Sequence, residues 1–199
     1  MADGMTMDLA PLQGLFRELR TTLPQQLQVR IVRGAVATGA SVIRKAAIAL
    51  APIASPEDLS DEQRATHPPG TLKKAIYQVR LSDASTPTLE VWKVDVRKGS
   101  RTTKKGNRLA SAFYAGWVEH GHWSRPASGK GTKAGRIKRR GDRAINALAA
   151  GARWVPARPY MRPAFEANKA AAVAAMKAYL EHNISAGKLA LEYLKVGGF

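Results

Sequence analysis

The sequence predicts an α+β fold, with long helices near both ends of the chain and a small antiparallel sheet between them. Two patterns carry this prediction. Apolar residues recur every three or four positions over 24–51 and 163–182, and every second position over 72–96. With 199 residues, of which 45% are hydrophobic, the chain is large and apolar enough for one buried core. We therefore expect a single domain over residues 1–199.

A helix is predicted over residues 24–51. Its expected buried face consists of Val29, Val32, Val36, Gly39, Ile43, Ala46 and Leu50. Pro24 suits the first turn, and Pro52 ends the helix because it excludes the preceding residue from the α region. The small residues Gly39 and Ala46 would let a partner helix approach closely. A shorter helix ending near Thr22 is predicted from Leu9, Leu12, Leu15, Phe16 and Leu19.

Two segments with alternating apolar residues, 71–81 and 88–99, flank the turn sequence SDASTP and predict an antiparallel hairpin. A third apolar run, LASAFYAGWVEHGHW, fits either a strand or a helical turn. The last long helix, which Pro163 enters, has an expected buried stripe of Phe165, Ala172, Val173, Met176, Tyr179 and Leu180. A separate short helix is expected after Gly187.

The chain is strongly basic, with a formal net charge of +17. Residues 97–143 hold fourteen Lys and Arg against two Asp and Glu, so they carry +12 of this charge. Interspersed Gly, Ser and Thr predict two basic loop extensions, 97–108 and 123–154. Flexible cations contact phosphates or acidic partners without reading a sequence, and a solvated surface is the alternative. The expected contact residues are Arg97, Lys98, Arg101, Lys104, Lys105, Arg136, Lys138, Arg139 and Arg140. No aromatic residue lies between Trp123 and Trp154, so we expect no reading of bases by these loops.

Catalytic groups are sparse in this sequence. The one candidate cluster is Glu119, His120 and His122, whose histidines would share one side of a strand and could hold a metal with the carboxylate. A fourth ligand and a general base have no visible source. We therefore expect no metal, no cofactor and no enzymatic activity. The absence of cysteine fits assembly in a reducing cytoplasm, and no apolar stretch long enough for a signal peptide or a membrane span is present.

The sequence PARPYMRPAF combines stiff, cationic and aromatic residues before the last helix. Three prolines fix φ, two arginines offer planar donors for carboxylates or carbonyls, and the aromatic side chains offer apolar anchors. We expect an assembly clasp, within or between subunits, made of Pro156, Ala157, Arg158, Pro159, Tyr160, Met161, Arg162, Pro163 and Phe165. Elsewhere, Gly70 and Gly121 are expected to take positive φ at sharp turns, the second of them next to Glu119.

Several motifs together resemble the tail-completion or head-tail joining proteins of tailed bacteriophages, the group that includes minor tail protein Z. They are a helix ending at Ala51-Pro52, the strand start at Gly70, Leu72 and Lys73, the turn YAGWVEHGH (114–122), and the segment from Pro156 to Ala164. The resemblance implies a structural protein in a homo-oligomeric ring in the virion neck, assembled in the host cytoplasm. Its partners would be portal or adaptor proteins, tail proteins and genomic DNA in the channel, with no membrane. Two features depart from the pattern of this family. The basic segment 123–154 stands where the family has a short link, and His122 stands where Thr or Ser is common.

Two other functions stay open from the residues alone. The first is a protein that binds nucleic acid without sequence specificity, through the basic loops. The second is a metal-dependent nuclease built on Glu119, His120 and His122. Oligomeric state separates the ring component from the nucleic-acid-binding protein, and a requirement for divalent metal tests the nuclease.

Overall fold

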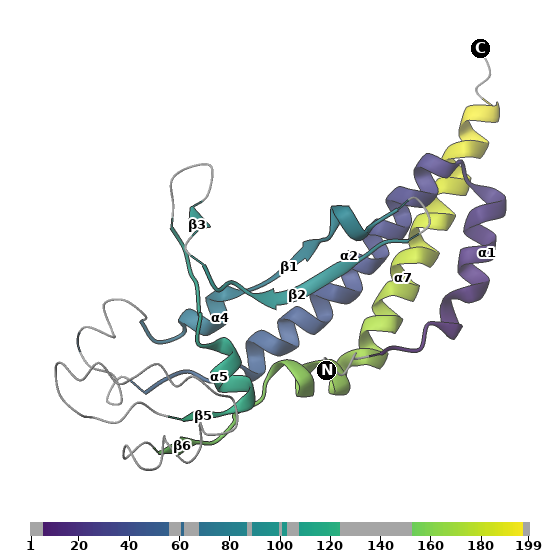
Figure 1. The fold of residues 1–199 in the computed structure, drawn as a ribbon. Coiled ribbons are helices and arrows are strands. Elements are labelled where there is room, and N and C mark those ends of the chain that lie inside the picture. Colours follow the sequence, from purple (N-terminus) through teal and green to yellow (C-terminus); the bar gives the residue numbers. More distant parts are fainter. Residues whose placement is uncertain are drawn as a thin grey trace. The chain divides into compact units, whose positions relative to one another are not determined.

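The computed structural model describes residues 6–55, 61, 68–86, 89–99, 101–102, 108–123 and 153–196 (Figure 1). We expected one domain, and the chain groups into two compact units. Unit 1 comprises residues 1–112 and 160–199, and unit 2 comprises residues 113–159. Long helices and small antiparallel sheets together give the α+β class that the sequence predicts.

Three helices form the core of unit 1. α1 (Gln13–Thr22), which follows the short 3-10 turn η1 (Ala10–Leu12), packs with α2 (Gln25–Leu50) and α7 (Met161–Val196). Their shared buried side chains are Leu12, Leu19, Leu23, Ile31, Ala35, Val173, Met176, Leu180 and Ile184. The predicted N-terminal helix and the predicted helix over 24–51 are both confirmed.

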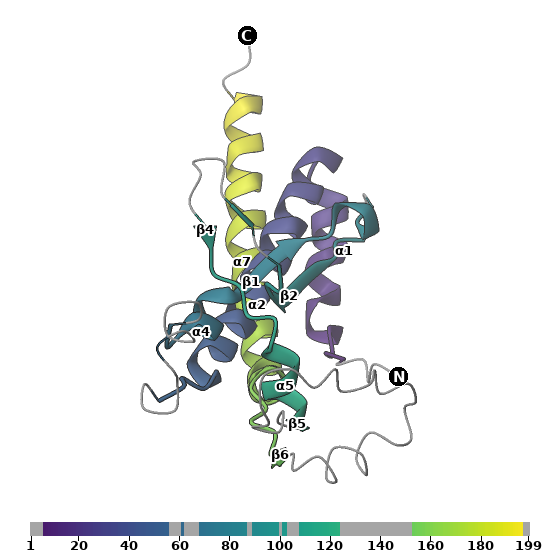
Figure 2. The ribbon, with the colours of Figure 1, turned by 60° about the vertical axis from the view of Figure 1, so that its left-hand side comes forward.

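α2 and α7 run antiparallel and side by side (Figures 1 and 2). Gly34 of α2 faces Tyr179 of α7, and Gly39, farther along α2, faces Met176. A Cβ on Gly39 would lie 2.8 Å from Met176 Cγ, so the missing side chain makes room for the neighbouring helix. The close approach that the sequence predicts at Gly39 is therefore confirmed.

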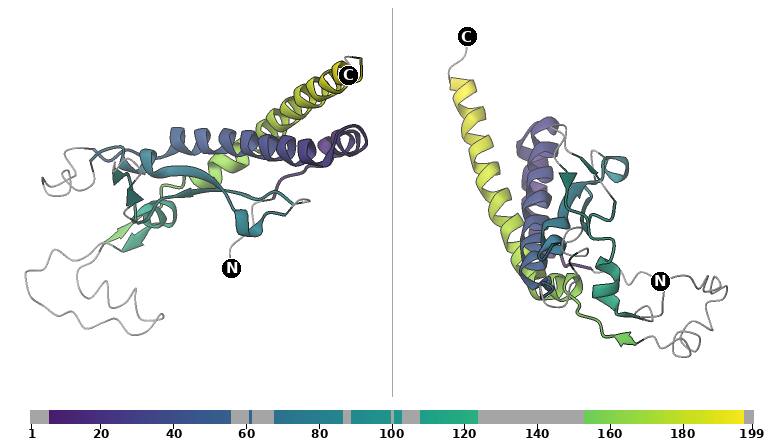
Figure 3. Two further views of the ribbon diagram at one scale, coloured as in Figure 1. Left: turned by 90° about the horizontal axis from the view of Figure 1, so that it is seen from above. Right: turned by 90° about the vertical axis from the view of Figure 1, so that its left-hand side faces the viewer.

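The buried face of α2 differs from the predicted one. Its most buried residues are Ile31, Ala35, Gly39, Ile43 and Ala47, whereas Val29, Val32, Val36 and Ala46 are only partly buried and Leu50 is half exposed. The reason is that α2 packs on two elements at once, with α7 on one side and the hairpin of β1 (Ile76–Arg80) and β2 (Trp92–Val96) on the other (Figure 3). Apolar residues therefore occupy two faces of the helix, and a single stripe does not describe them.

The predicted hairpin is present, but its first strand is shorter than expected. β1 (Ile76–Arg80) pairs antiparallel with β2 (Trp92–Val96), with Ile76 opposite Val96. Residues Thr71–Ala75, expected in the first strand, instead form the helical turn α4 (Figure 2). Leu72 and Ala75 are both buried and lie three residues apart, which is a helical spacing. This spacing is the reason why the apolar residues at the start of segment 71–81 do not alternate strictly. The 3-10 turn η3 (Ser82–Ala84) lies in the connection between the two strands.

α7 begins as predicted and ends later than predicted. Pro163 lies in its first turn, where the N–H groups have no partner within the helix. The helix then continues through Gly187, so the separate short helix expected there does not form. Gly187 packs against Leu23, with a Cβ position 3.0 Å from Leu23 Cδ2. This tertiary contact offsets the roughly 1 kcal/mol by which a helical glycine is less favourable than alanine. Within the predicted stripe, Ala172, Val173, Met176 and Leu180 are buried, and Phe165 and Tyr179 are partly buried.

The first basic extension contains a short strand pair in unit 1. β3 (Arg101–Thr102) pairs antiparallel with β4 (Arg108–Leu109), which the prediction of a loop over 97–108 did not include. The connecting residues 103–107 lie outside the described part of the chain. Among the described residues, no helix is both long and apolar enough to cross a membrane.

The described part of unit 2, residues 113–123 and 153–159, consists of one short helix and a two-stranded ribbon. α5 (Ala115–His120) is followed by β5 (His122–Trp123), which pairs antiparallel with β6 (Trp154–Val155). The apolar run that fitted a strand or a helical turn therefore contains both, with Gly121 between them. Most of the second basic extension, residues 124–152, lies outside the described residues.

Candidate assembly site

The candidate site of unit 2 joins two sequence motifs that are far apart in the chain. The backbone N–H of Arg158, in the predicted clasp, donates to the carbonyl oxygen of Val118 on α5 at 2.8 Å. The β5–β6 ribbon adds the pairs His122 with Val155 and Trp123 with Trp154. The turn motif and the proline-rich motif therefore form one structural module, which their sequence separation did not reveal.

Gly121 lies at the centre of this module. Its φ is +74°, in the region that L side chains rarely adopt. A Cβ there would also lie 2.7 Å from Trp154 Cζ2, 2.9 Å from the carbonyl oxygen of Val155 and 3.0 Å from the N atom of Ala157. Both the conformation and the close approach of the second strand require glycine. The predicted positive φ at Gly121 is observed.

Gly70 also has the positive φ that we expected, at +80°, but for a different reason. It precedes α4, where the N–H of Lys74 donates to the Gly70 carbonyl at 3.2 Å and the hydroxyl of Thr71 donates to the Pro68 carbonyl at 2.5 Å. Apart from its own atoms and those of its two chain neighbours, no atom of the described residues lies within 4 Å of a Cβ built on Gly70. Its requirement for glycine is conformational only.

The predicted clasp divides into an exposed part and a buried part. Pro156, Ala157, Arg158 and Pro159 are exposed. In unit 1, Tyr160 has 1% of its surface exposed and Ala164 is fully buried, whereas Met161 and Phe165 are partly buried and Arg162 and Pro163 are exposed. The expected burial of Tyr160 is therefore confirmed. Pairing of the Arg158 and Arg162 side chains with carboxylates or carbonyls stays a prediction.

The proposed metal-ligand cluster does not have the geometry that the sequence suggested. His120 ends α5 and His122 lies on β5, so the two histidines do not share one face of a strand. The His122 ring stacks on Trp117, with centroids 5.4 Å apart and planes at 24°. Within the described part of the chain, no three His, Asp or Glu side chains are grouped so that they could hold a metal ion.

The expected contact cations fall into three groups. Arg97 differs from the expectation, because its guanidinium donates to the Ala110 carbonyl at 2.9 Å and lies 5.0 Å from the Tyr77 ring centroid. This partly buried side chain holds unit 1 together. Lys98 is exposed, and the backbone of Arg101 is paired in β3. The remaining cations lie outside the described residues: Lys104, Lys105, Arg136, Lys138, Arg139 and Arg140.

Sequence analysis missed an exposed set of aromatic side chains in unit 2. Phe113, Trp117 and Trp154 have 52%, 50% and 51% of their surface exposed. Phe113 packs edge-on to Trp117 at 5.5 Å between centroids, and Trp154 packs edge-on to Trp123 at 5.5 Å. The density of Phe, Tyr and Trp over 113–123 was the signal available in the sequence. The two tryptophans that bound the basic segment meet across the ribbon.

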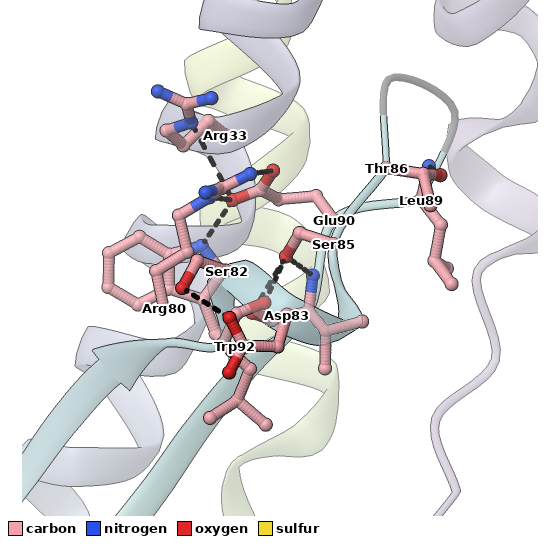
Figure 4. A network of polar contacts seen from close by, with 11 residues as sticks. Arg33, Arg80, Ser82, Asp83, Ser85, Thr86, Leu89, Glu90 and Trp92 are labelled. Atoms are coloured by element: carbon pink, nitrogen blue, oxygen red, sulfur yellow. Dashed lines mark hydrogen bonds and ion pairs between the residues drawn. The ribbon is translucent and has the colours of Figure 1, made fainter.

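Unit 1 contains a polar network at the end of the hairpin (Figure 4). Glu90, whose side chain is 4% exposed, accepts hydrogen bonds from Arg80 at 2.5 and 3.0 Å and from Trp92 Nε1 at 3.1 Å. Arg33 Nε lies 3.7 Å from the same carboxylate. The hydrogen bonds from Arg80 and Trp92 hold the pKa of Glu90 below its ordinary value, against the opposing effect of burial. The hydrogen bonds of this network lie within the hairpin, and Arg33 connects it to α2.

Two cavities in unit 1 are lined mainly by apolar side chains. One, of about 350 Å³, lies between α2, β2 and the first half of α7, and Lys93 is the charged residue in its lining. The other, of about 370 Å³, lies between α1, α2 and the hairpin connection, next to Glu90 and Arg20. The Glu90 carboxylate in the second lining is already bonded to Arg80 and Trp92, and we assign no chemistry to these cavities.

Comparisons of the chain with protein-family models, with curated proteins and with solved structures found no match.

Proposed function

We propose that the chain is a structural component of the neck of a tailed bacteriophage. In this role it joins or completes the tail at the head-tail interface, as one subunit of a ring around the DNA channel, and it resides in the virion. The sequence motifs that resemble the tail-completion proteins support this proposal. The observation that carries it furthest is the hydrogen bond from the Arg158 N–H to the Val118 carbonyl, which joins the turn motif and the proline-rich motif in one module.

The physical properties of the clasp suit an intersubunit contact. Residues 156–159 are exposed and contain two prolines, which restrict φ before any partner binds. Within unit 2, the pairing of β6 up to Val155 and the hydrogen bond from the Arg158 N–H to the Val118 carbonyl hold this short segment. A segment that is already ordered loses little conformational entropy when it docks on a neighbour. Arg158, within this segment, offers planar donors that suit a carboxylate on the neighbouring subunit.

Head-to-tail contacts between identical subunits close into a ring when the rotation between them permits it. The isolated protein should therefore form a closed multimer, or join one with its neck partners, as measured by native mass spectrometry and negative-stain electron microscopy. Arg158→Ala should weaken this assembly while leaving the monomer folded. The decisive measurement is the position of a tagged chain in purified particles. A position other than the neck would rule the proposal out.

A second candidate function, binding of nucleic acid without sequence specificity, is favoured by the charge of +12 on residues 97–143. In a neck protein the same cations would face the DNA in the channel or an acidic patch on a portal or adaptor protein. A variant with Lys138, Arg139 and Arg140 changed to glutamine distinguishes these roles. Loss of DNA binding with intact assembly indicates the DNA, whereas failed head-tail joining with intact DNA binding indicates the protein partner. If neither DNA binding nor head-tail joining changes, these cations form a solvated surface.

A further inference from the structure

The exposed aromatic side chains of unit 2 differ from ordinary surface residues in number and arrangement. Single exposed apolar residues are common on proteins, but Phe113, Trp117 and Trp154 are all about half exposed within one small unit. Each belongs to a ring–ring contact: Trp117 packs on both Phe113 and His122, and Trp154 packs on Trp123. The rings are therefore held in place while part of each stays open to solvent.

The ribbon determines how these rings are presented. His122 and Trp123 are consecutive on β5, so their side chains point to opposite faces of the ribbon. Trp117 covers the face that carries His122, and Trp154 pairs with Trp123 on the other face. Each face of the ribbon therefore presents one half-exposed tryptophan. The positions are fixed by α5 and by the contact of Trp154 with Gly121.

The charge of the same unit indicates the chemistry of the partner. Residues 113–159 contain ten Lys and Arg against two Asp and Glu, a net charge of +8. The rest of the chain holds 22 Lys and Arg against 13 Asp and Glu, which gives +9. A second copy of the chain would bring like charges together, whereas a polyanion would be attracted. Arg153 and Arg158, both exposed, are the Lys or Arg residues of this unit within the described part of the chain.

We propose that Trp117 and Trp154 are stacking positions for the bases of single-stranded nucleic acid. Unpaired bases stack on aromatic side chains whatever their sequence, while neighbouring cations neutralise the phosphates. In a duplex the bases are already stacked on one another, so single strands should bind more tightly. An anionic lipid surface would also attract the charge, but α5 has six residues and is too short for a helix that lies in a membrane interface. The proposal does not depend on the neck function.

The first test uses the unmodified protein and two probes, a fluorescein-labelled oligothymidylate and an oligomer of the same length whose sugars carry no bases. Fluorescence anisotropy should show the oligothymidylate binding about tenfold or more tightly, because both probes have the same phosphates and only one has bases to stack. Equal affinity for the two probes would overturn the proposal. This comparison needs no mutation and is independent of how any variant folds.

The second test replaces the rings. Trp117→Ala and Trp154→Ala should each weaken oligothymidylate binding by about tenfold, with no change in the dependence of log affinity on log salt. Trp154→Tyr should retain most of the affinity, since a flat ring remains. Arg158→Gln should instead reduce the salt slope by about 0.7, the value for one phosphate contact on a single strand. Leu189→Ala, on an exposed leucine of α7, is the matched control and should change nothing.

Two alternative partners are measured in parallel. Binding to anionic phosphatidylserine vesicles that is tighter than binding to the oligomer, and lost in Trp117→Ala, would assign the rings to a lipid surface and overturn the proposal. If Trp117→Ala or Trp154→Ala loses the multimers but binds oligothymidylate unchanged, the aromatic side chains mediate contacts between copies of the chain. That result would also overturn the proposal. If the tryptophan variants still form multimers but bind oligothymidylate more weakly, the result supports the proposal and leaves the neck function untouched.

Discussion

The indole of Trp154 occupies the space that a side chain on residue 121 would need: a Cβ built on Gly121 would lie 2.7 Å from Trp154 Cζ2. This contact connects the turn that follows α5 with the strand that precedes the clasp. The same glycine has a φ of +74°. Residue 121 therefore controls both the direction of the chain and the position of an exposed tryptophan.

Gly121→Ala should destabilise unit 2 strongly. With φ at +74° and ψ at 166°, Gly121 occupies a region that is essentially restricted to glycine, so an alanine there costs about 1–3 kcal/mol, and the contacts with Trp154 and the Val155 carbonyl add a steric cost. We expect faster amide hydrogen exchange at Arg158, whose N–H bonds to Val118, than in the unmodified protein.

Gly70→Ala is the control for a positive φ without a steric contact. Gly70 lies in the left-handed helical region, with a ψ of 1°, and among the described residues no atom beyond its chain neighbours lies within 4 Å of its Cβ position. It should show the conformational cost alone, in the stability of unit 1. Gly116→Ala, in α5 with an open Cβ position, should slightly stabilise unit 2. Equal effects of Gly121→Ala and Gly116→Ala would contradict the steric argument.

The Glu90 network should make the stability of unit 1 depend on acid pH. Its hydrogen bonds with Arg80 and Trp92 lower the pKa of Glu90 in the folded protein. Glu90 therefore contributes stability that is complete above the unfolded pKa of about 4.3, and this stability is lost as the pH falls through the lower folded pKa. In urea unfolding at pH 7, Glu90→Gln should lower the free energy of unfolding by on the order of 1–2 kcal/mol. The difference from the unmodified protein should shrink below pH 4.

Arg33→Gln is the control for the Glu90 prediction. Arg33 is exposed and its Nε lies 3.7 Å from the carboxylate, so this ion pair should contribute little. A loss of stability in Arg33→Gln as large as that in Glu90→Gln would show that charge alone, and not the hydrogen bonds, stabilises the hairpin.

Gly39 and Met176 should show energetic coupling across the α2–α7 contact. Gly39→Ala alone should destabilise by about 1–3 kcal/mol, because its Cβ would lie 2.8 Å from Met176 Cγ. In a Met176→Ala background that crowding is absent, and the same change should be favourable by about 0.5–1 kcal/mol, the gain from replacing a helical glycine. A double-mutant cycle in urea measures the coupling. Simple additivity would show that the side chain of Met176 moves away at no cost.

The sequence was most informative where one local pattern determines the structure. Pro24 and Pro52 bracket α2, and the alternating residues of the hairpin give the pairing of β1 with β2. The two predicted turn glycines both have positive φ. At these places the backbone preference of a few neighbouring residues is enough to fix the conformation.

Prediction failed where packing between distant segments decides the result. α7 continues through Gly187 because Leu23 packs there, and Arg97 turns inward to Ala110 and Tyr77. The module formed by Val118 and Arg158 is invisible to local patterns, since forty residues separate its partners. Trp117 and Trp154 were individually visible, but their presentation on a ribbon depends on that same long-range pairing.

Tyr160 and Arg158 should separate folding from assembly at the clasp. Tyr160 is among the largest fully buried side chains, so Tyr160→Ala should cost about 3–5 kcal/mol and lower the melting temperature of unit 1. Arg158→Ala, on an exposed side chain, should change the free energy of unfolding by less than about 0.5 kcal/mol.

Arg158→Pro tests the backbone of the clasp separately from the arginine side chain. Proline removes the N–H that donates to the Val118 carbonyl at 2.8 Å, whereas alanine keeps it. If the hydrogen bond holds the clasp in place, Arg158→Pro should speed amide exchange along α5 and weaken multimer formation more than Arg158→Ala does. If the guanidinium makes the dominant contact with a neighbour, the two variants should impair assembly equally, with exchange along α5 faster only in the proline variant. Normal multimers and normal incorporation into particles for both variants would show that the segment takes no part in assembly.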